Sequence, residues 1–121
     1  MDDPRARFIV DDGRNYLTHT AESYDVISIE VGQTYRPGVA SFYTAEFYRA
    51  AGKRLKPGGL LCQFLPIAFF SMEEIETLTA TFLGEFPDSV LWYNTAELLL
   101  IGCRDQPIVL RSDRAEMLAT N

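Results

Sequence analysis

The sequence predicts an α/β layer fold whose mostly parallel sheet ends in an antiparallel hairpin. Short apolar runs alternate with segments of helical periodicity along the chain, which is typical of parallel strands joined by crossover helices. Near the end, two apolar runs are separated only by residues 94–96, a link so short that the two strands must pair antiparallel. A length of 121 residues fits one domain with a hydrophobic core.

The first part of the chain is predicted to run from strand to helix to strand. Residues 7–10 form an apolar run that ends at an Asp-Asp-Gly turn, where Asp12 is placed to cap a short helix over 13–20. Residues 23–30 form the next expected strand, and its apolar centre indicates burial on both faces. A long loop over 31–41, with proline and glycine, follows this strand.

Helix signals mark the middle of the chain. Thr44 is expected to cap a helix that has an apolar residue at every fourth position. This helix is predicted to end at residues 56–59, where a proline and two glycines follow a basic last turn. Residues 60–65 are predicted to form a third buried strand. Ser71 and Glu74 form a capping box, which predicts a further helix that ends at a proline.

The last predicted strands are 89–93 and 98–103, the two arms of the hairpin. The tail over 105–121 is mostly polar, and we expect at most a short helix there, around residues 114–119. No internal repeat or interdomain linker is visible.

Composition and charge exclude several classes of protein. The formal net charge of -6 argues against nucleic-acid binding, which needs a basic patch. No apolar run approaches the roughly 20 residues that span a bilayer, and the N-terminus has no apolar signal-peptide core. Cys62 and Cys103 lie far apart within apolar runs, so we expect buried free thiols and a reducing, cytoplasmic location. No histidine or cysteine spacing indicates a metal site.

An acid, Glu30, stands where the second predicted strand ends. In open α/β sheets, ligands bind beyond the carboxyl ends of strands, so this residue is a candidate for chemistry. A carboxylate at that point can orient a cationic amine and take or share its proton. The residue pattern leaves open the alternative of a solvated acid at a strand end.

Five segments occur in an order and at intervals that point to a known family: VDDGRNYL, YDVISIE, GVASFYTAEFY, RLKPGGLLCQ and FLGEFP. Together they resemble the carboxyl-terminal half of the spermidine/spermine synthases, the polyamine aminopropyltransferases. The resemblance implies a Rossmann-like sheet of the class I methyltransferase type. The family's glycine-rich cofactor loop and ribose-binding acid would precede Met1. The resemblance therefore implies a partial domain over 1–104 that lacks the first two strands, followed by a tail over 105–121.

The resemblance also implies roles for the acids. Asp12, with Gly13 beside it, matches the acid that accepts a hydrogen bond from the adenine amino group, a role compatible with helix capping. Glu30 occupies the place of the family's catalytic aspartate. Gln33 replaces a second acid of the same segment, so one carboxylate stands where the family usually has two.

The substrate-binding residues that the resemblance implies are Gln33, Tyr35 and Gln63. Aromatic faces attract alkylammonium groups, so Tyr35 suits a polyamine groove, with core or rim packing as the alternative. For Gln63 the alternative is an amide that pairs with neighbouring backbone.

By resemblance, the complete domain transfers an aminopropyl group from decarboxylated S-adenosylmethionine to a polyamine or similar amine. We expect no tightly bound cofactor, since decarboxylated S-adenosylmethionine or S-adenosylmethionine would be a cosubstrate of the complete domain. Two alternatives stay open: a methyltransferase-like domain, and a non-catalytic half-domain that acts through association. Missing strands would leave unpaired sheet edges, so we expect a homodimer or higher oligomer. Because the family's cofactor loop and ribose-binding acid would precede Met1, the resemblance implies an isolated chain without activity.

Overall fold

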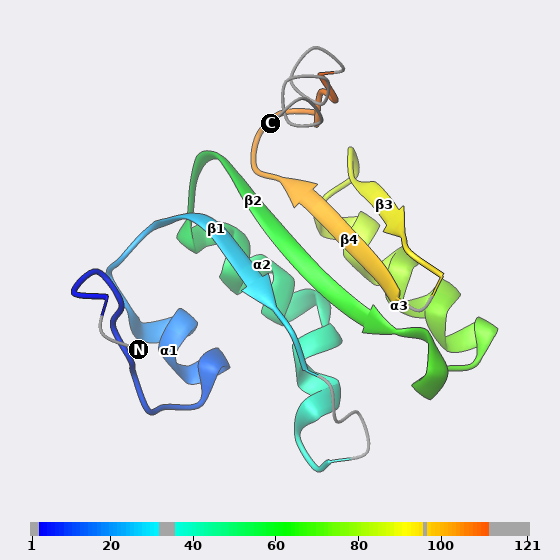
Figure 1. The fold of residues 1–121 in the computed structure, drawn as a ribbon, viewed down its shortest axis with the longest axis horizontal. Coiled ribbons are helices and arrows are strands. Elements are labelled where there is room, and N and C mark those ends of the chain that lie inside the picture. The colour runs from blue at the N-terminus through cyan, green and yellow to red at the C-terminus, as the bar shows by residue number, and fades with distance from the viewer. Residues whose placement is uncertain (1–2, 32–35, 96, 112–121) are drawn as a thin grey trace.

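The computed structural model describes residues 3–31, 36–95 and 97–111. In chain order (Figure 1), its elements are α1 (Gly13–His19), β1 (Tyr24–Ile29), the 3-10 helix η1 (Val39–Tyr43), α2 (Ala45–Arg54), β2 (Leu55–Pro66), the 3-10 helix η2 (Ile67–Phe69), α3 (Met72–Glu85), β3 (Val90–Tyr93) and β4 (Glu97–Cys103). The predicted tail helix around 114–119 lies outside the described residues, as do Gln33 and Tyr35.

The sheet is mixed, with strand order β1-β2-β4-β3. β1 runs parallel to β2, whereas β4 pairs antiparallel with both β2 and β3. The α/β class and the closing hairpin are therefore confirmed. Parallel pairing among the described strands is limited to β1 and β2, so less of the sheet is parallel than the sequence predicts.

The strand predicted at residues 7–10 is wrong. These residues form no strand and are exposed, with Phe8 77% exposed. Figure 1 shows the N-terminal segment apart from the sheet. A single strand needs a neighbour for its backbone hydrogen bonds, and no described strand lies beside this segment.

Side chains cap the helices as the sequence predicts. Asp12 accepts hydrogen bonds from two backbone N–H groups of α1, and Thr44 accepts one from the first turn of α2. Ser71 and Glu74 form a reciprocal capping box at the start of α3. Each cap satisfies donors that a helix leaves unpaired in its first turn, and so fixes where the helix begins.

β2 begins at Leu55, earlier than the predicted strand, because the Lys-Pro-Gly-Gly segment belongs to it. Gly58 adopts a left-handed φ of 73°. A Cβ on Gly59 would lie 2.9 Å from the carbonyl oxygen of Lys56, so a side chain has no room there. The two glycines let the chain turn tightly from α2 into the sheet.

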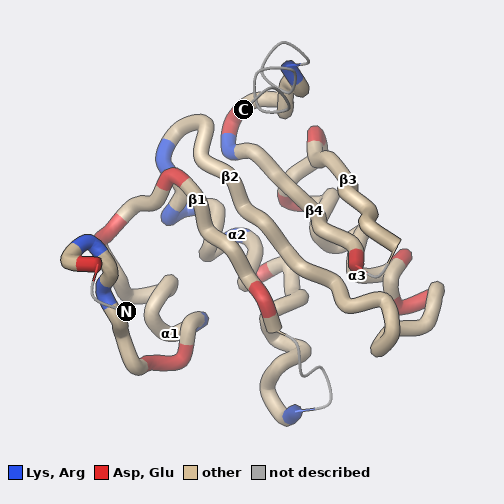
Figure 2. Tube along the Cα trace, viewed as in Figure 1, with Lys and Arg blue, Asp and Glu red and all other residues tan. Residues whose placement is uncertain are grey.

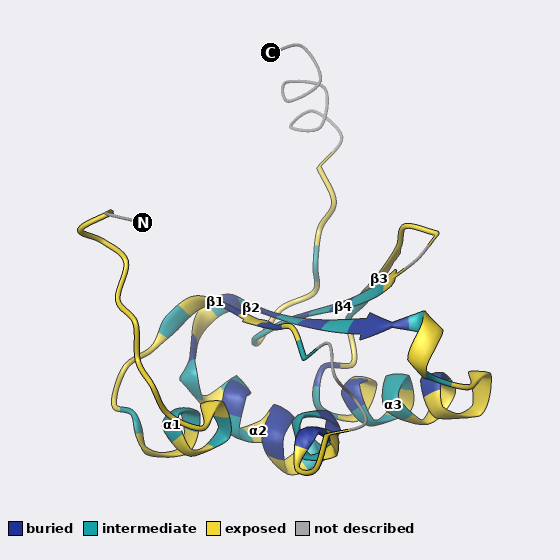
Figure 3. Cartoon of the chain, turned by 60° about the horizontal axis from the view of Figure 1, so that its bottom comes forward, coloured by how far each residue is buried: buried dark blue, intermediate teal, exposed yellow. Residues whose placement is uncertain are grey.

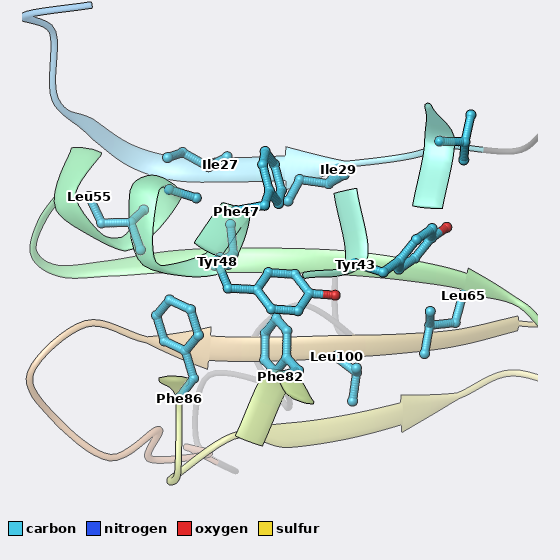
Figure 4. Close-up of a cluster of buried hydrophobic side chains, with 13 residues drawn as sticks. Ile27, Ile29, Tyr43, Phe47, Tyr48, Leu55, Leu65, Phe82, Phe86 and Leu100 are labelled. Carbon is cyan, nitrogen blue, oxygen red and sulfur yellow. The ribbon is translucent and has the colours of Figure 1, made fainter. Parts of the chain in front are cut away.

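The helices lie on one face of the sheet and enclose the core with it (Figure 3). Tyr48 of α2 is fully buried, and its ring meets Phe82 of α3 edge to face, with 5.0 Å between centroids (Figure 4). The strands contribute the buried residues Ile27, Ile29, Leu61, Leu65 and Leu100. None of the described helices is long and apolar enough to cross a membrane.

The opposite face of the sheet is covered by no described helix (Figure 3). Side chains alternate along β1, so Val26 faces away from the helices and is 55% exposed, whereas Ile27 is buried. Trp92 of β3 pairs with Leu99 of β4 on the same open face and is 59% exposed. Burial of β1 on both faces, as predicted, is therefore wrong for the described chain.

Both cysteines lie on this uncovered face, which explains why the prediction of buried thiols is wrong. Cys62 pairs with Ile101, and Cys103 pairs with Leu60, in the antiparallel ladder. The thiols are free and partly exposed. Partial burial raises the pKa of the Cys62 thiol.

Candidate functional site

The carboxyl ends of β1 and β2 lie side by side because the two strands are parallel neighbours. Ile29, the last residue of β1, pairs with Gln63 of β2, so Glu30 follows at this edge of the sheet. The Glu30 side chain is exposed and forms no ion pair with any other described residue. Figure 2 shows acidic positions near the ends of β1 and none in its middle. A carboxylate is thus available where the sequence places the candidate catalytic acid.

Gln63 is fully buried, and its amide is only half satisfied. Its Nε2 donates to the carbonyl oxygen of Phe64 at 3.0 Å, whereas Oε1 has no hydrogen-bond partner among the described residues. A buried carbonyl without a donor costs about 1–3 kcal/mol. Buried polar atoms are nearly always paired, so an unpaired one indicates a water or ligand position.

The structure brings Glu30 and Gln63 to the same edge but into different surroundings. Ile27 and Ile29 are buried against the helices, whereas Ser28 and Glu30 are exposed. Gln63 belongs to the buried row of β2. The two candidate residues are therefore close along the backbone but do not share one exposed surface.

Asp12 is fixed at the start of α1 by Arg14. Its Oδ2 lies 2.8 Å from Nη2 of Arg14, and its Oδ1 accepts hydrogen bonds from Nε of Arg14 at 3.1 Å and from the backbone N–H groups of Arg14 and Asn15. The Arg14 guanidinium is the main reason that the pKa of the Asp12 carboxyl lies far below its usual range. The side chain stays partly exposed, and Oδ2 can accept a further hydrogen bond.

Gly13 is the first residue of α1. A Cβ at this position would lie 3.6 Å from the ring of Phe42, an ordinary contact. The described surroundings therefore give no steric reason for a glycine, and the predicted cofactor role of Gly13 stays a prediction.

Arg14 connects α1 to the segment that follows Glu30. Its Nη1 donates to the hydroxyl of Ser41 in η1, and its guanidinium carbon lies 5.3 Å from the ring centroid of Phe42. Sequence reasoning missed this role because no local signal links residues that lie so far apart along the chain. Arg14 thus holds the candidate cofactor acid in place relative to η1.

Gln33 and Tyr35 belong to a segment outside the described residues, so their predicted substrate contacts stay predictions. No group of metal-ligating side chains occurs among the residues that the structure describes.

The chain matches the spermine/spermidine synthase domain over residues 1–96. Among curated proteins, it is 34% identical over 73 residues to the polyamine aminopropyltransferases of Escherichia coli O139:H28 (strain E24377A / ETEC) and Escherichia coli (strain K12 / DH10B). Each match covers 60% of this chain and 25% of the relative. The chain therefore spans about a quarter of the length of these curated relatives.

Two solved structures share the fold. A spermidine synthase in complex with the transition state analogue AdoDATO superposes with a TM-score of 0.73 and 21% identity, over 85% of this chain and 38% of that one. The spermidine synthase from Thermotoga maritima gives a TM-score of 0.68 and 23% identity, over 85% and 36% of the two chains. These superpositions confirm the partial Rossmann-like fold.

Proposed function

Because the chain belongs to the spermine/spermidine synthase family, we propose that residues 1–104 supply the amine-acceptor side of an aminopropyl-transferring domain, with 105–121 as an appended tail. The donor would be decarboxylated S-adenosylmethionine, and the acceptor a polyamine or similar amine. The observation that carries this proposal is the place of Glu30. An exposed carboxylate, without an ion pair among the described residues, follows the carboxyl end of β1 beside a parallel neighbour.

The proposed transfer is a nucleophilic substitution in which Glu30 acts on the amine. The neutral amine nitrogen attacks the carbon next to the sulfonium. A C–N bond forms, the C–S bond breaks, and its electron pair goes to sulfur, which leaves as a thioether. Glu30 orients the ammonium form of the acceptor and takes its proton, a contribution of about 10²–10⁴-fold in rate for a positioned general base.

The other candidate residues would hold the two substrates. Asp12, already held by Arg14, would accept a hydrogen bond from the adenine amino group on the remaining lone pair of Oδ2, with Gly13 beside it. Gln63 is kept as a proposed substrate residue for its unpaired Oε1, although its amide is fully buried in the described chain and shares no exposed surface with Glu30. Gln33 and Tyr35 complete the proposed substrate set.

Titration calorimetry on the chain distinguishes this function from its alternatives. Because the chain covers 38% of the solved synthase it superposes on, we propose that transfer needs the complete domain. Binding of decarboxylated S-adenosylmethionine, or of its thioether product, in preference to S-adenosylmethionine supports the proposal. Preference for S-adenosylmethionine would favour the methyltransferase-like alternative.

Activity can be tested in a chimera that carries residues 1–96 of this chain in place of the matching part of the Escherichia coli aminopropyltransferase. We expect Glu30→Gln to lower the transfer rate by about 10²–10⁴-fold. Glu22→Gln, which removes the same charge from another exposed position, is the matched control. Equal rates in the two variants would remove Glu30 from the mechanism.

A second role, association of two copies, is favoured by the uncovered sheet face. Every residue that the strand alternation places there in the middle of the sheet is uncharged, and charged positions lie near the strand ends (Figure 2). Two copies can therefore pack these faces together without opposing like charges, although each chain carries a net charge of -6. The outer edge of β1, which pairs with no described strand, adds a second contact surface.

Light scattering over a range of concentrations tests this association. Trp92→Glu places a charge on the open face, and we expect it to give monomers. Tyr93→Glu is the matched control, because Tyr93 pairs with Leu98 on the helix side of the same strand and is similarly exposed. Monomeric wild-type protein, or equal dissociation by both variants, would contradict the proposed dimer.

We also propose that the chain functions in the cytoplasm. The support is chemical: Cys62 and Cys103 are both free and partly exposed, a state that a reducing compartment maintains. Labelling of cell extracts with maleimide should modify both thiols without prior reduction. Labelling that requires a reductant would contradict the proposal.

A further inference from the structure

β3 forms the free edge of the sheet on the side opposite β1. The strand order β1-β2-β4-β3 leaves no described strand beyond it, and Figure 1 shows β3 (yellow) as the outermost strand. The strand, Val90–Tyr93, consists of two aliphatic and two aromatic residues. An apolar edge strand of this kind is a template on which another extended chain can pair.

The hydrogen bonds of the hairpin fix which backbone groups of β3 point outward. The N–H of Asn94 donates to the carbonyl oxygen of Glu97 at 3.2 Å, so these two residues form a hydrogen-bonded pair. Hydrogen-bonded and non-hydrogen-bonded pairs alternate along an antiparallel ladder. Trp92 is therefore a hydrogen-bonded position, and the N–H and C=O groups of Leu91 and Tyr93 point away from β4.

The other side of β4 gives the same assignment. The N–H of Arg104, just after β4, donates to the carbonyl oxygen of Gly59 in β2 at 2.9 Å. Even-numbered positions of β4 therefore direct their backbone groups toward β2, and odd-numbered positions such as Leu99 direct theirs toward β3. The outward groups of Leu91 and Tyr93 thus face no described strand.

The side chains along this edge are exposed and uncharged. Leu91, Trp92 and Tyr93 are 52%, 59% and 60% exposed. Figure 2 shows no charged position along β3. Natural edge strands are commonly protected by charged residues or proline, and residues 90–94 include neither. A second chain can therefore pair here without opposing like charges.

The edge is complementary to itself. Its two outward-facing residues, Leu91 and Tyr93, lie on either side of Trp92. Two antiparallel copies of β3, related by a two-fold axis at Trp92, match Leu91 of each copy with Tyr93 of the other. The residues of each matched pair exchange both of their N–H···O=C bonds, so all the outward backbone groups of Leu91 and Tyr93 gain partners.

We propose that β3 pairs antiparallel with β3 of a second copy, so that one sheet continues through both chains. Trp92 then lies opposite the partner's Trp92 in a non-hydrogen-bonded pair, where opposing side chains are closest. This contact uses backbone groups at the sheet edge, so it is separate from packing of the uncovered faces and does not rest on the proposed transfer. One short strand from each copy buries little surface, so the pairing is weak and concentration-dependent.

Amide hydrogen exchange of the 121-residue chain, followed by NMR at a series of protein concentrations, tests the pairing. An N–H group that is bonded only in the dimer exchanges more slowly as the protein concentration rises. We expect the exchange of Leu91 and Tyr93 to slow several-fold between dilute and concentrated protein. Trp92 is the matched control, because its N–H is already bonded within the hairpin, and its exchange should change far less.

Variants separate the edge from the uncovered face. Val26→Glu places a charge on that face in β1, at the other side of the sheet, and we expect sedimentation velocity to find this variant dimeric at high concentration. Addition of Leu91→Pro removes one outward N–H, a change that an edge strand tolerates, and should give monomers. Addition of Leu91→Ala is the matched control, because it shortens the same side chain, keeps the N–H and should retain most of the dimer.

Trp92 supplies a spectroscopic signature of the pair. It is the only tryptophan of the chain, so an interaction between two indoles can arise only between copies. In Val26→Glu, the opposed indoles should give an exciton couplet in circular dichroism that grows with protein concentration. The couplet should be absent after addition of Leu91→Pro.

Several outcomes would overturn the proposal. A monomeric Val26→Glu variant would assign all association to the uncovered face. Exchange at Leu91 and Tyr93 that does not depend on concentration would show that their N–H groups gain no partner. Equal dissociation by Leu91→Ala and Leu91→Pro would assign the contact to the side chain instead of the backbone. None of these results depends on whether the chain takes part in aminopropyl transfer.

Discussion

Gln63 allows a direct test of whether the sheet keeps a functional amide at the expense of stability. In Gln63→Met, an unbranched side chain of similar size replaces the buried amide. The substitution removes the unpaired Oε1, which costs about 1–3 kcal/mol, and loses the bond from Nε2 to Phe64, worth about 0.5–1.5 kcal/mol. The difference predicts a variant more stable than wild type by about 1 kcal/mol.

Urea unfolding followed by circular dichroism, at one fixed protein concentration, measures this difference. Leu61→Met is the matched control, because Leu61 lies in the same buried row of β2 and the exchange should cost less than about 1.5 kcal/mol. Comparison of midpoints is valid if the slopes with denaturant are equal. In the chimera described above, Gln63→Met should weaken acceptor binding while it stabilises the fold, as expected when stability is sacrificed for function.

Greater destabilisation by Gln63→Met than by Leu61→Met would contradict this prediction. That result would mean that Oε1 has a partner in solution, such as a buried water, and that the amide is structural. A stabilised variant with unchanged acceptor binding would keep the energetic argument and remove Gln63 from the proposed substrate set.

Further predictions concern two glycines and one acid. Gly102→Ala should destabilise the fold by about 1–3 kcal/mol, because the new Cβ would lie 2.6 Å from Cγ of Phe86. Gly84→Ala should stabilise α3 by about 0.5–1 kcal/mol, because no atom lies within 4 Å of the new Cβ. Urea unfolding midpoints check both predictions. Asp12 has a lowered pKa in the folded state, so its contribution is present above the usual value of 3.8 and is lost as the pH falls below it. Asp12→Asn retains a cap but no charge, so its melting temperature should fall less between pH 5 and pH 2 than that of wild type. An identical fall in both proteins would show that the pair with Arg14 adds no stability.

The features that the sequence predicts correctly are those set by near neighbours. The caps at Asp12, Thr44 and Ser71 each depend on donors within three residues, so the local sequence contains all the information. The strand predicted at 7–10 has the right composition but no partner, and pairing is a property of the whole sheet. Similarly, the hairpin is predicted from its short link, but the position of β4 between β2 and β3 is not.

The candidate site divides in the same way. Glu30 and Gln63 could be placed at one edge because parallel strands align their carboxyl ends. The burial of the Gln63 amide, with its unpaired oxygen, depends on how the helices pack above β2 and has no local signal. The same holds for Arg14, whose contacts in η1 arise only when α1 packs beside that segment.

The residues on the uncovered sheet face are more apolar than a solvent-exposed face requires. A strand with one solvated face normally alternates apolar and polar residues. β2 has Leu61 and Leu65 toward the helices, but Leu60, Cys62 and Phe64 on the other side are also apolar or weakly polar. This composition suits a sheet covered on both faces, and the described helices cover only one (Figure 3). The described helices supply no second layer, and a second copy of the chain is the source that light scattering with Trp92→Glu can accept or reject.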